Sequence, residues 1–430
     1  QGESFNAEKA LAMGVVNELA PSSETEAKAT AWVKANPTAK APWDVKGFKV
    51  PGGVPHRSPG AGQVMTMANA MLHAKTYGNY PAQKNILSCI YEGIMVPIDA
   101  GLRIETRYFI NTQQRPEAKA MIRSLFLSTQ ALSKGANRPA GVPKYELNKV
   151  AVIGAGLMGA GIAYEQARAG IETILVDVSV ENAEKGKDYS RKLVEKNVSR
   201  GKMTKEKGEA LLALIKPTAN YDDFKGADLV VEAVFENPEL KAKITQMAEA
   251  QLSDTAVMGS NTSTLPITGL AEASVRPANF IGIHFFSPVE RMGLVEIISG
   301  KETSEETLAK TIDYVLKIRK TPIVVNDSRG FYTSRCFGTY TQEGLEMLGE
   351  GIKPAIIENV GRQSGMPMGP LEVSDSVGLD TALKVGRQMA QAMGVDYTND
   401  ARGQMMAWLV EDQGRVGRKA GKGFYDYNEK

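Results

Sequence analysis

The fold is decided by the stretch Lys149-Val-Ala-Val-Ile-Gly154-Ala-Gly156-Leu-Met-Gly159. A short apolar run leads straight into three spaced glycines, and apolar residues at helical spacing follow to about residue 169. In a strand-turn-helix unit of this kind, Gly154 permits the tight turn and Gly156 lets a pyrophosphate approach the backbone. Gly159 lets the helix pack closely on the strand, and the helix N-terminus faces the phosphate charge. The stretch therefore predicts a dinucleotide-binding turn.

The residue that ends the next expected strand predicts which dinucleotide binds. The run 173–177 ends in Asp177, 23 residues after Gly154. A carboxylate at this place accepts hydrogen bonds from both ribose hydroxyls and repels a 2′-phosphate, so NAD is favoured over NADP. The alternative is a glycine-rich turn that binds no cofactor, but strand, helix and acid all stand where a cofactor site needs them.

From residue 149 onward, short β-branched runs alternate with helical stretches. This alternation indicates a mostly parallel, doubly wound α/β sheet of the Rossmann type. After Asp327 only helical patterns continue, so we expect an all-helical C-terminal domain. The predicted strands are 149–153, 173–177, 228–234, 256–259, 280–284, 294–298 and 322–325, and the predicted C-terminal helices are 331–348, 354–365, 380–393 and 401–411.

The region before residue 148 differs from this pattern. The run Val50-Pro-Gly-Gly-Val-Pro55 indicates a linker, and breakers at 137–143 close a region of connector helices. The connector helices are expected at 62–77, 82–107 and 116–134. The expected domains are a segment 1–36, linker and connector helices 37–147, an NAD-binding domain 148–326 and a helical domain 327–430.

Composition and charge exclude several classes of protein. The 430 residues carry 51 Lys plus Arg against 49 Asp plus Glu, a net charge of +2, and 43% are apolar. This composition fits a globular protein of two or three domains better than a general nucleic-acid or membrane binder. Cys89 and Cys336 are isolated, so neither a disulfide framework nor a metal site is expected, and a reducing compartment is favoured. No apolar run reaches the roughly 18 residues of a membrane span and no secretory signal opens the chain, so we expect an intracellular protein.

The scarcity of histidine indicates a candidate catalytic base. Of three histidines, His56 and His73 lie in the linker and connector, which leaves His284 at the carboxyl end of the strand 280–284. Open α/β sheets bind ligands at that edge. Glu296 follows twelve residues later between apolar neighbours, where it needs a partner. A neutral imidazole suits removal of a hydroxyl proton as hydride leaves carbon, and the carboxylate would orient the ring. Spacing alone equally allows a strand-end histidine satisfied by backbone groups.

Two further patterns allow both a functional and a structural interpretation. The run Ser260-Asn-Thr-Ser263 offers hydroxyl and amide groups at the same sheet edge, but its residue types equally suit a capped turn into a helix. Between Lys185 and Lys207 nine basic residues outnumber three acidic ones. A solvated helix face is the favoured interpretation, and a site for a polyanionic ligand tail is the alternative.

In their order and spacing, several motifs resemble those of L-3-hydroxyacyl-CoA dehydrogenases. One further stretch, Glu8-Lys-Ala-Leu-Ala-Met-Gly-Val-Val-Asn-Glu18, resembles the tail of an enoyl-CoA hydratase domain. Hydratase tail, connector and dehydrogenase follow in this order in the multifunctional α-subunits of the fatty acid β-oxidation complex. Besides the glycine-rich stretch, the dehydrogenase motifs are Val231-Glu-Ala-Val-Phe-Glu236, Ser260-Asn-Thr-Ser263, His284-Phe-Phe-Ser-Pro288, Gly330-Phe-Tyr-Thr-Ser-Arg335, Met366-Pro-Met-Gly-Pro370 and Gly421-Lys-Gly-Phe-Tyr425.

The resemblance implies NAD-dependent oxidation of (S)-3-hydroxyacyl-CoA to 3-oxoacyl-CoA, with substrate bound between the two domains. It implies that His284 is the catalytic base, that Glu296 is its partner, and that Ser263 touches both the substrate and the nicotinamide side. The implied NAD-contact positions, besides the glycine-rich turn, are Met158, Asp177, Val234, Glu236, Lys241, Ser263 and Ser287, and the implied substrate contacts are Ser263 and Ser334.

Two positions depart from the commonest family pattern. Ser287 and Ser334 stand where the family usually has Asn near the active site, and this pair of changes resembles the long-chain trifunctional α-subunit branch. The catalytic glutamates of a hydratase domain would lie before Gln1. Segment 1–36 is therefore expected to be a hydratase remnant without hydratase activity.

The resemblance also implies partners and a compartment. We expect a thiolase β-subunit in the intact complex, a homodimer or hetero-oligomer, and a bacterial cytoplasm or an organellar matrix. Two other functions stay open. One is a two-domain Rossmann dehydrogenase acting on a free hydroxy acid, which would generally use lysine as its base. The other is a non-catalytic fragment that binds NAD or acyl-CoA within an assembly.

Overall fold

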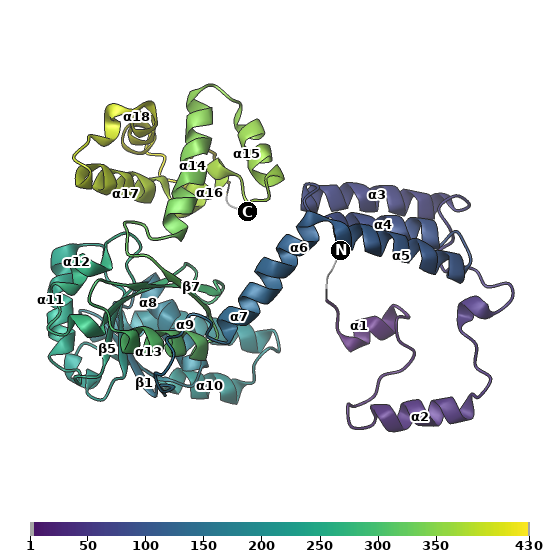
Figure 1. The fold of residues 1–430 in the computed structure, drawn as a ribbon, viewed down its shortest axis with the longest axis horizontal. Helices are drawn as coiled ribbons and strands as arrows, with labels where there is room; N and C mark the ends of the chain where they lie inside the picture. Colours follow the sequence, from purple (N-terminus) through teal and green to yellow (C-terminus); the bar gives the residue numbers. More distant parts are fainter. Residues whose placement is uncertain (1–3, 429–430) are drawn as a thin grey trace. The chain divides into compact units, whose positions relative to one another are not determined.

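The computed structural model describes residues 4–428, so the first three residues of the predicted segment 1–36 lie outside the described residues (Figure 1). The chain forms two compact units. One contains the residues up to Arg123 together with Val360–Pro367, and the other contains Ser124–Asn359 and the residues from Met368 onward. Within the described range, no helix is both long and apolar enough to cross a bilayer.

The second unit is built on one sheet, for which the described residues supply eight strands in the order β3-β2-β1-β4-β5-β6-β7-β8. Neighbouring strands are parallel except β6 and β7, which are antiparallel, so the prediction of a mostly parallel sheet is confirmed. The strand order reverses direction between β1 and β4, and ligands of such sheets bind at the carboxyl ends beside this point. The strands are β1 Lys149–Ile153, β2 Glu172–Val176, β3 Ile215–Thr218, β4 Leu229–Glu232, β5 Val257–Ser260, β6 Phe280–Phe285, β7 Leu294–Ser299 and β8 Thr321–Val325.

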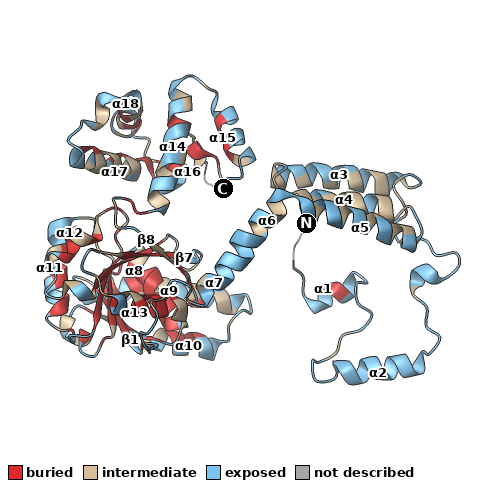
Figure 2. Ribbon diagram, in the orientation of Figure 1, coloured by how far each residue is buried: buried red, intermediate tan, exposed pale blue. Residues whose placement is uncertain are grey.

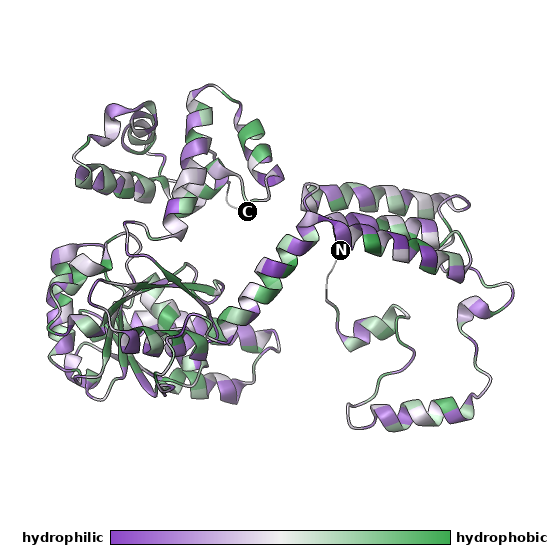
Figure 3. Ribbon diagram, in the orientation of Figure 1, coloured by the Kyte–Doolittle hydropathy of each residue, from purple (hydrophilic) through white to green (hydrophobic). Residues whose placement is uncertain are grey.

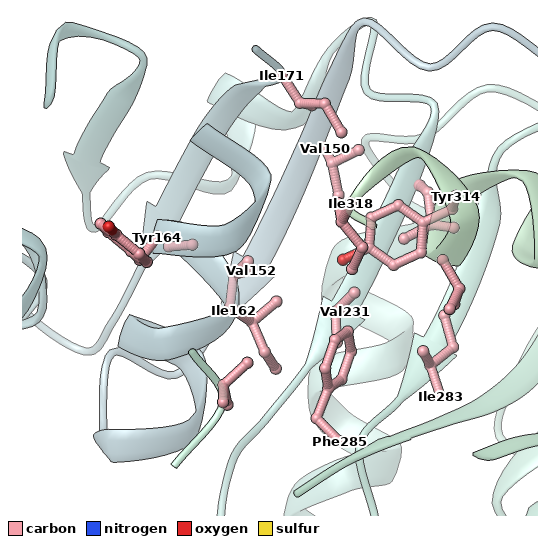
Figure 4. Packing of buried hydrophobic residues seen from close by; sticks show 14 of the residues in the cluster. Val150, Val152, Ile162, Tyr164, Ile171, Val231, Ile283, Phe285, Tyr314 and Ile318 are labelled. Atoms are coloured by element: carbon pink, nitrogen blue, oxygen red, sulfur yellow. The ribbon is translucent and has the colours of Figure 1, made fainter. Parts of the chain in front are cut away.

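Helices cover both faces of this sheet, because alternate residues of each strand point to opposite sides. Val150 and Val152 pack in one apolar cluster with Tyr314 and Ile318, as Figure 4 shows, whereas Ala151 and Ile153 pack in the other. The strands and the helix faces toward them form the buried part of the unit (Figure 2). The covering helices are α8 Leu157–Arg168, α9 Val180–Ser199, α10 Lys205–Ala213 and α13 Glu305–Lys317 on the first face, and α11 Pro238–Glu249 and α12 Ile267–Ala271 on the second.

Up to residue 428 the chain continues after the sheet as helices, as predicted, with two isolated β-bridges near its described end. Leu345, Leu371, Leu383 and Met406 belong to the common apolar core of these helices. The buried carboxylate of Asp375 accepts hydrogen bonds from the backbone N–H groups of Phe424 and Tyr425 and from the hydroxyl of Tyr427, which holds the last described residues onto this core. The helices are α14 Thr333–Gly349, α15 Pro354–Gln363, α16 Pro370–Val377, α17 Leu379–Ala392 and α18 Ala401–Ala407, which continues as a π-turn over Trp408–Asp412.

One element prediction was wrong, and several elements were not predicted, among them a strand and a helix of the second unit. Strand β3 was not predicted, because Ile215-Lys-Pro-Thr218 is short and contains a proline, which a sheet tolerates at an edge strand such as this one. The predicted helix 82–107 is two helices, α4 Pro81–Gly93 and α5 Ile98–Gln114, because Pro97 interrupts it. Helix α16 was also not predicted, since its eight residues are fewer than a periodic pattern needs.

The first unit is helical and has little core of its own. Among residues 4–123 only Ala10 is buried. Apolar side chains such as Val64, Ile90 and Leu102 are therefore exposed on its helices, which carry apolar and polar residues side by side in Figure 3. Besides α4 and α5, its helices are α1 Ala7–Ala12, α2 Thr25–Ala35, α3 Pro59–Thr76 and α6 Pro116–Met121. The helical run continues through a π-turn to α7 Thr129–Ser133 in the second unit, where α7 packs against the edge strand β8.

Candidate active site

The glycine-rich turn joins β1 to α8 at the carboxyl edge of the sheet. Gly154 has a φ of +97°, and a Cβ there would lie 2.7 Å from the carbonyl oxygen of Ala233, so only glycine fits. A Cβ on Gly159 would collide with the carbonyl of Gly154, which is the close helix-strand approach predicted for this residue. A Cβ on Gly156 would have no heavy atom within 4 Å. Gly156, the N-cap of α8, therefore leaves open space where a phosphate can approach the helix N-terminus.

Asp177 lies directly beside this turn. Its carboxylate accepts hydrogen bonds from the backbone N–H of Ala155 at 2.7 Å and from that of Val178 at 2.7 Å. A longer hydrogen bond of 3.4 Å comes from the side chain of Asn182. Because a carboxylate has about four acceptor positions and this one is half-buried, capacity is left for a ribose hydroxyl. The residues at this edge thus fit an NAD molecule, with acceptors for the ribose and open N–H groups for the pyrophosphate.

Exposed apolar side chains surround the same edge, and sequence reasoning missed them. Leu157, Val178 and Phe235 are 59%, 90% and 83% exposed, and they follow the ends of β1, β2 and β4. The predicted contact residues Met158 and Val234 are half-buried beside the same strand ends. Apolar side chains in such places suit a flat apolar group such as adenine. The available signal was an apolar residue shortly after a strand, where turns are usually polar.

A buried ion pair lies under the turn that follows β4. The ammonium of Lys241 donates to both carboxylate oxygens of Glu232, at 2.8 and 2.9 Å, and the two residues are 2% and 1% exposed. Ser260 and the backbone N–H of Val234 also donate to Glu232. Lys241 lies 3.6 Å from Glu236 as well. The ammonium of this predicted NAD-contact residue is therefore directed at two carboxylates. Through Glu232 and Glu236 it stabilises the turn that follows β4.

Glu236 and Ser263, which come from two different turns, meet directly. The backbone N–H and the hydroxyl of Ser263 donate to Glu236 Oε1 at 2.7 and 3.2 Å, and Thr262 Oγ1 donates to the same oxygen. Because a carboxylate only accepts, the hydroxyl proton of Ser263 is committed to Glu236 and its lone pairs stay free. Thr262 Oγ1 also accepts from the N–H groups of Thr264 and Leu265, which closes a turn, but α12 takes no side-chain cap from this run, because the N–H groups of Ile267 and Thr268 donate to Asp327.

His284 and Glu296 are opposite each other on the antiparallel strands β6 and β7, and their side chains therefore share one face of the sheet. Nδ1 of His284 lies 2.6 Å from Glu296 Oε2, and the residues are 6% and 0% exposed. Nδ1 must carry the proton of this hydrogen bond, because the carboxylate only accepts. The ring is thus held by a carboxylate and not by backbone groups. No protein group among the described residues hydrogen-bonds to Nε2, which is left for a ligand.

Glu296 is held from a second side by the start of α14. It accepts hydrogen bonds from the N–H groups of Tyr332 and Thr333 at 3.2 and 2.9 Å and from the Thr333 hydroxyl at 2.9 Å. Burial alone would raise the pKa of the Glu296 carboxyl, but the hydrogen bonds from His284 and Thr333 outweigh it and hold the pKa below its usual range. Glu296 is therefore a charged partner for the imidazole at neutral pH.

The backbone before α14 is bent to reach Glu296. Gly330 and Phe331 have φ values of +73° and +48°, and the left-handed region costs a residue such as Phe about 1–2 kcal/mol. The burial of the Phe331 ring offsets this cost, because the side chain is 1% exposed and lies 6.0 Å from the His284 ring. The His284 ring has a second aromatic neighbour, Phe286, and the centroids of these two rings are 4.5 Å apart. Thr333 was not predicted as a site residue, because no local pattern links it to residue 296.

The two unusual serines lie near this pair in the sequence but are not joined to it by a hydrogen bond within residues 4–428. Ser287 is exposed in the turn after β6, and Ser334 is half-buried in the first turn of α14. Asn261 was missed by sequence reasoning as a support of the site. Its Oδ1 accepts from the backbone N–H of Phe285 at 2.8 Å, which ties the turn after β5 to the strand that carries His284.

The basic residues between Lys185 and Lys207 have the features of a solvated helix face. All of them except Lys187 are exposed. Lys185 pairs with Glu181 at 2.7 Å and Arg191 pairs with Asp188, in both cases within α9. The exposed cations that are not paired in this way are available to an anionic ligand.

Family models match most of the second unit. Residues 149–328 match the model of the 3-hydroxyacyl-CoA dehydrogenase NAD binding domain, and residues 330–427 match that of the C-terminal domain of the same family. Among solved structures, (S)-3-hydroxybutyryl-CoA dehydrogenase from Ralstonia eutropha matches with a TM-score of 0.62 and 35% identity over 66% of this chain and 100% of that chain. The 3-hydroxybutyryl-CoA dehydrogenase from Escherichia coli matches with a TM-score of 0.62 and 32% identity, over 66% and 61% of the two chains.

Similarity to curated proteins extends over the whole chain. The fatty acid oxidation complex subunit alpha of Shewanella frigidimarina is 36% identical over 430 residues, which is 100% of this chain and 59% of the relative. The protein of the same name from Psychrobacter arcticus is 36% identical over 97% of this chain and 58% of its own length. The chain thus spans about three fifths of the length of these relatives. With both domain models matched in sequence order, the chain belongs to the 3-hydroxyacyl-CoA dehydrogenase family, whose sheet domain binds NAD.

Proposed function

We propose that this chain catalyses the NAD-dependent oxidation of (S)-3-hydroxyacyl-CoA to 3-oxoacyl-CoA in fatty acid β-oxidation. The observation that carries the proposal is the buried pair in which His284 donates through Nδ1 to Glu296 and keeps Nε2 for a ligand. The names of the related solved structures and of the curated relatives support the same reaction class.

His284 acts as the general base in this proposal. Nε2 takes the proton of the substrate 3-hydroxyl, and the negative charge of Glu296 stabilises the imidazolium that forms. NAD, when bound, supplies the acceptor for the hydride that leaves the carbon bearing this hydroxyl. A positioned base of this kind contributes about 10²- to 10⁴-fold to the rate. Ring contacts from Phe286 and Phe331 and the carboxylate on Nδ1 keep the imidazole in one orientation.

The hydrogen bonds of Ser263 suggest a contact with the nicotinamide and not a donor to the substrate oxygen. Its hydroxyl donates to Glu236, so its oxygen is left as an acceptor, which suits the N–H of the nicotinamide carboxamide. The charge on the substrate oxygen is then balanced mainly by the imidazolium. Ser287 on the cofactor side and Ser334 on the substrate side complete the proposed contacts, in keeping with the family motifs in which they stand.

The substrate class and the partners are also proposals. The exposed cations of α9 and α10 suit the phosphates of coenzyme A, since exposed basic side chains attract a polyanion at close range. Because the relatives are named as subunits of a fatty acid oxidation complex, we propose a thiolase β-subunit as partner and a homodimeric or hetero-oligomeric assembly. Since these relatives are bacterial, we propose the cytoplasm as the compartment. We propose for residues 1–36 and 37–147 the roles of a hydratase remnant and a connector.

The test is NADH formation from NAD with (S)-3-hydroxyacyl-CoA of short, medium and long chain, for the wild type and His284→Gln. His73→Gln is the matched control, because His73 is exposed on α3 in the other unit. We expect His284→Gln to lose about 10²- to 10⁴-fold in turnover and His73→Gln to keep it. Turnover of a free hydroxy acid that survives His284→Gln would support the lysine-dependent alternative. NAD binding without turnover of any substrate would support a non-catalytic assembly fragment.

A further inference from the structure

The two carboxylate oxygens of Glu296 accept hydrogen bonds from different kinds of donor. Among the described residues, Oε1 accepts from two backbone N–H groups, those of Tyr332 and Thr333. Oε2 accepts from two side chains, the imidazole of His284 at 2.6 Å and the hydroxyl of Thr333 at 2.9 Å. The hydroxyl can only donate here, so it shares with the imidazole the electron density of one carboxylate oxygen.

We propose that Thr333 is a positioning residue that sets the base strength of His284 through Glu296. The proposal rests on the proposed function, because it concerns the proton that His284 takes. A donor on Oε2 lowers the charge that this oxygen offers to the imidazolium. The Thr333 hydroxyl therefore keeps the imidazole a weaker base than Glu296 alone would make it.

The surroundings of Glu296 leave few other groups that could set this balance. From β6 it faces His284, from β8 its register partner is the apolar Ile323, and from the start of α14 it meets the uncharged Thr333 and Tyr332. Among the described residues, His284 is the ionisable side chain that hydrogen-bonds to this carboxylate. Since Glu296 is fully buried, water does not replace a lost donor, and the hydroxyl's effect is not screened.

The test is the pH profile of kcat/KM for oxidation of the hydroxyacyl-CoA in Thr333→Val, which keeps the side-chain shape and removes the donor. Without the hydroxyl, Glu296 binds the imidazolium more tightly, so the acid limb moves to higher pH. We expect a shift of about half a pH unit to one unit, since a hydrogen bond to a charged group is strong and part of it is passed to the imidazole. Thr333→Ser should keep the wild-type profile. Thr339→Val, the same change on the exposed side of α14, is the matched control.

A second readout is independent of turnover. The chain has three histidines, so the imidazole of His284 can be assigned by comparison with the His284→Gln variant and titrated by NMR. In Thr333→Val its midpoint should move upward by the same amount as the acid limb. A midpoint and a profile equal to the wild type, or an equal shift in Thr333→Ser, would overturn the proposal while leaving the dehydrogenase function in place. Absence of turnover in the wild type would instead overturn the function, and the NMR midpoint would still decide the role of Thr333.

Discussion

We predict that the buried side chain of Lys320 stabilises the turn between β6, which carries His284, and β7, which carries Glu296. Its side chain is 4% exposed, and the ammonium donates to the carbonyl oxygens of Val289 and Met292 at 2.7 and 2.8 Å. A third contact, at 3.5 Å, reaches the fully buried carboxylate of Glu165 on α8. An ammonium has three donors, and these three acceptors use them all. The cation thereby fixes residues 286–293, the turn from β6 to β7, against the helix that starts at the glycine-rich turn.

The expected loss in Lys320→Met follows from these contacts. Removing one partner of a buried ion pair destabilises a fold by about 3–5 kcal/mol, and each carbonyl left without a donor adds about 1–3 kcal/mol. Arg168 offsets part of this loss, because it stays 2.6 Å from Glu165 Oε2 with a side chain that is 42% exposed. We therefore expect the free energy of unfolding to fall by at least about 3 kcal/mol near neutral pH. Glu165→Gln in the same chain should recover part of the loss, because it removes the uncompensated charge.

The pH dependence has a definite sign. Burial raises the pKa of the Glu165 carboxyl above its usual value, partly opposed by Lys320 and Arg168. Its protonated form therefore favours the folded state, and stability is lost as the pH rises through the pKa of the folded protein. Without Lys320 that pKa rises further. Lys320→Met should thus lie closest to the wild type at acid pH and fall behind as the pH increases.

The measurement is hydrogen exchange read by mass spectrometry, which reports the opening of the sheet separately from the other compact unit. Lys301→Met is the control, since Lys301 is exposed in the same unit. Equal protection of β7 and β8 in Lys320→Met and the wild type at neutral pH would refute the reasoning. So would a double variant with Glu165→Gln that is no more stable than Lys320→Met alone.

Two further predictions concern the glycine-rich turn and the acid limit of the fold. Gly154→Ala should lower the free energy of unfolding by more than about 1 kcal/mol, because residue 154 has a positive φ and lies close to the Ala233 carbonyl. Gly156→Ala should unfold like the wild type but lose NAD affinity, because residue 156 faces open space. Chemical denaturation and NAD titration of both variants check this difference. The lowered pKa of Glu296 means that its contribution to stability is present above pH 4.5, the ordinary value, and is lost as the pH falls through the pKa of the folded state. The stability difference between the wild type and Glu296→Gln should therefore shrink below that pH, and a constant difference in acid denaturation would contradict the assignment.

The sequence could predict the parts of the site that repeat a local pattern. Gly154 and Asp177 were predictable because a strand, a turn and a helix follow one another within a few residues, and their contacts are mostly local. His284 was found by elimination, as the one histidine in the sheet region. Its partner Glu296 was predictable because a carboxylate inside an apolar strand requires a donor.

Contacts between distant segments were beyond this kind of reasoning. Lys320 and Glu165 are far apart in sequence, and a lysine at a strand start gives no sign that it is buried. Thr333 likewise looks like an ordinary first residue of a helix, and only the bend at Gly330 and Phe331 brings its hydroxyl to Glu296. Such contacts depend on the packing of elements whose own sequence patterns are satisfied without them.

Glu296 joins two tasks that are usually separate. The first N–H groups of a helix need acceptors, and α14 has no side-chain N-cap of its own, so Glu296 takes that place from β7. The positive end of the helix dipole favours the charged carboxylate, which is also the form that the proposed mechanism needs beside the imidazolium of His284. Without the bend before α14, Glu296 would be a buried charge with one donor. The strained Phe331 backbone therefore makes the beginning of the helical domain part of the proposed catalytic pair, which explains why a costly conformation is kept at this place.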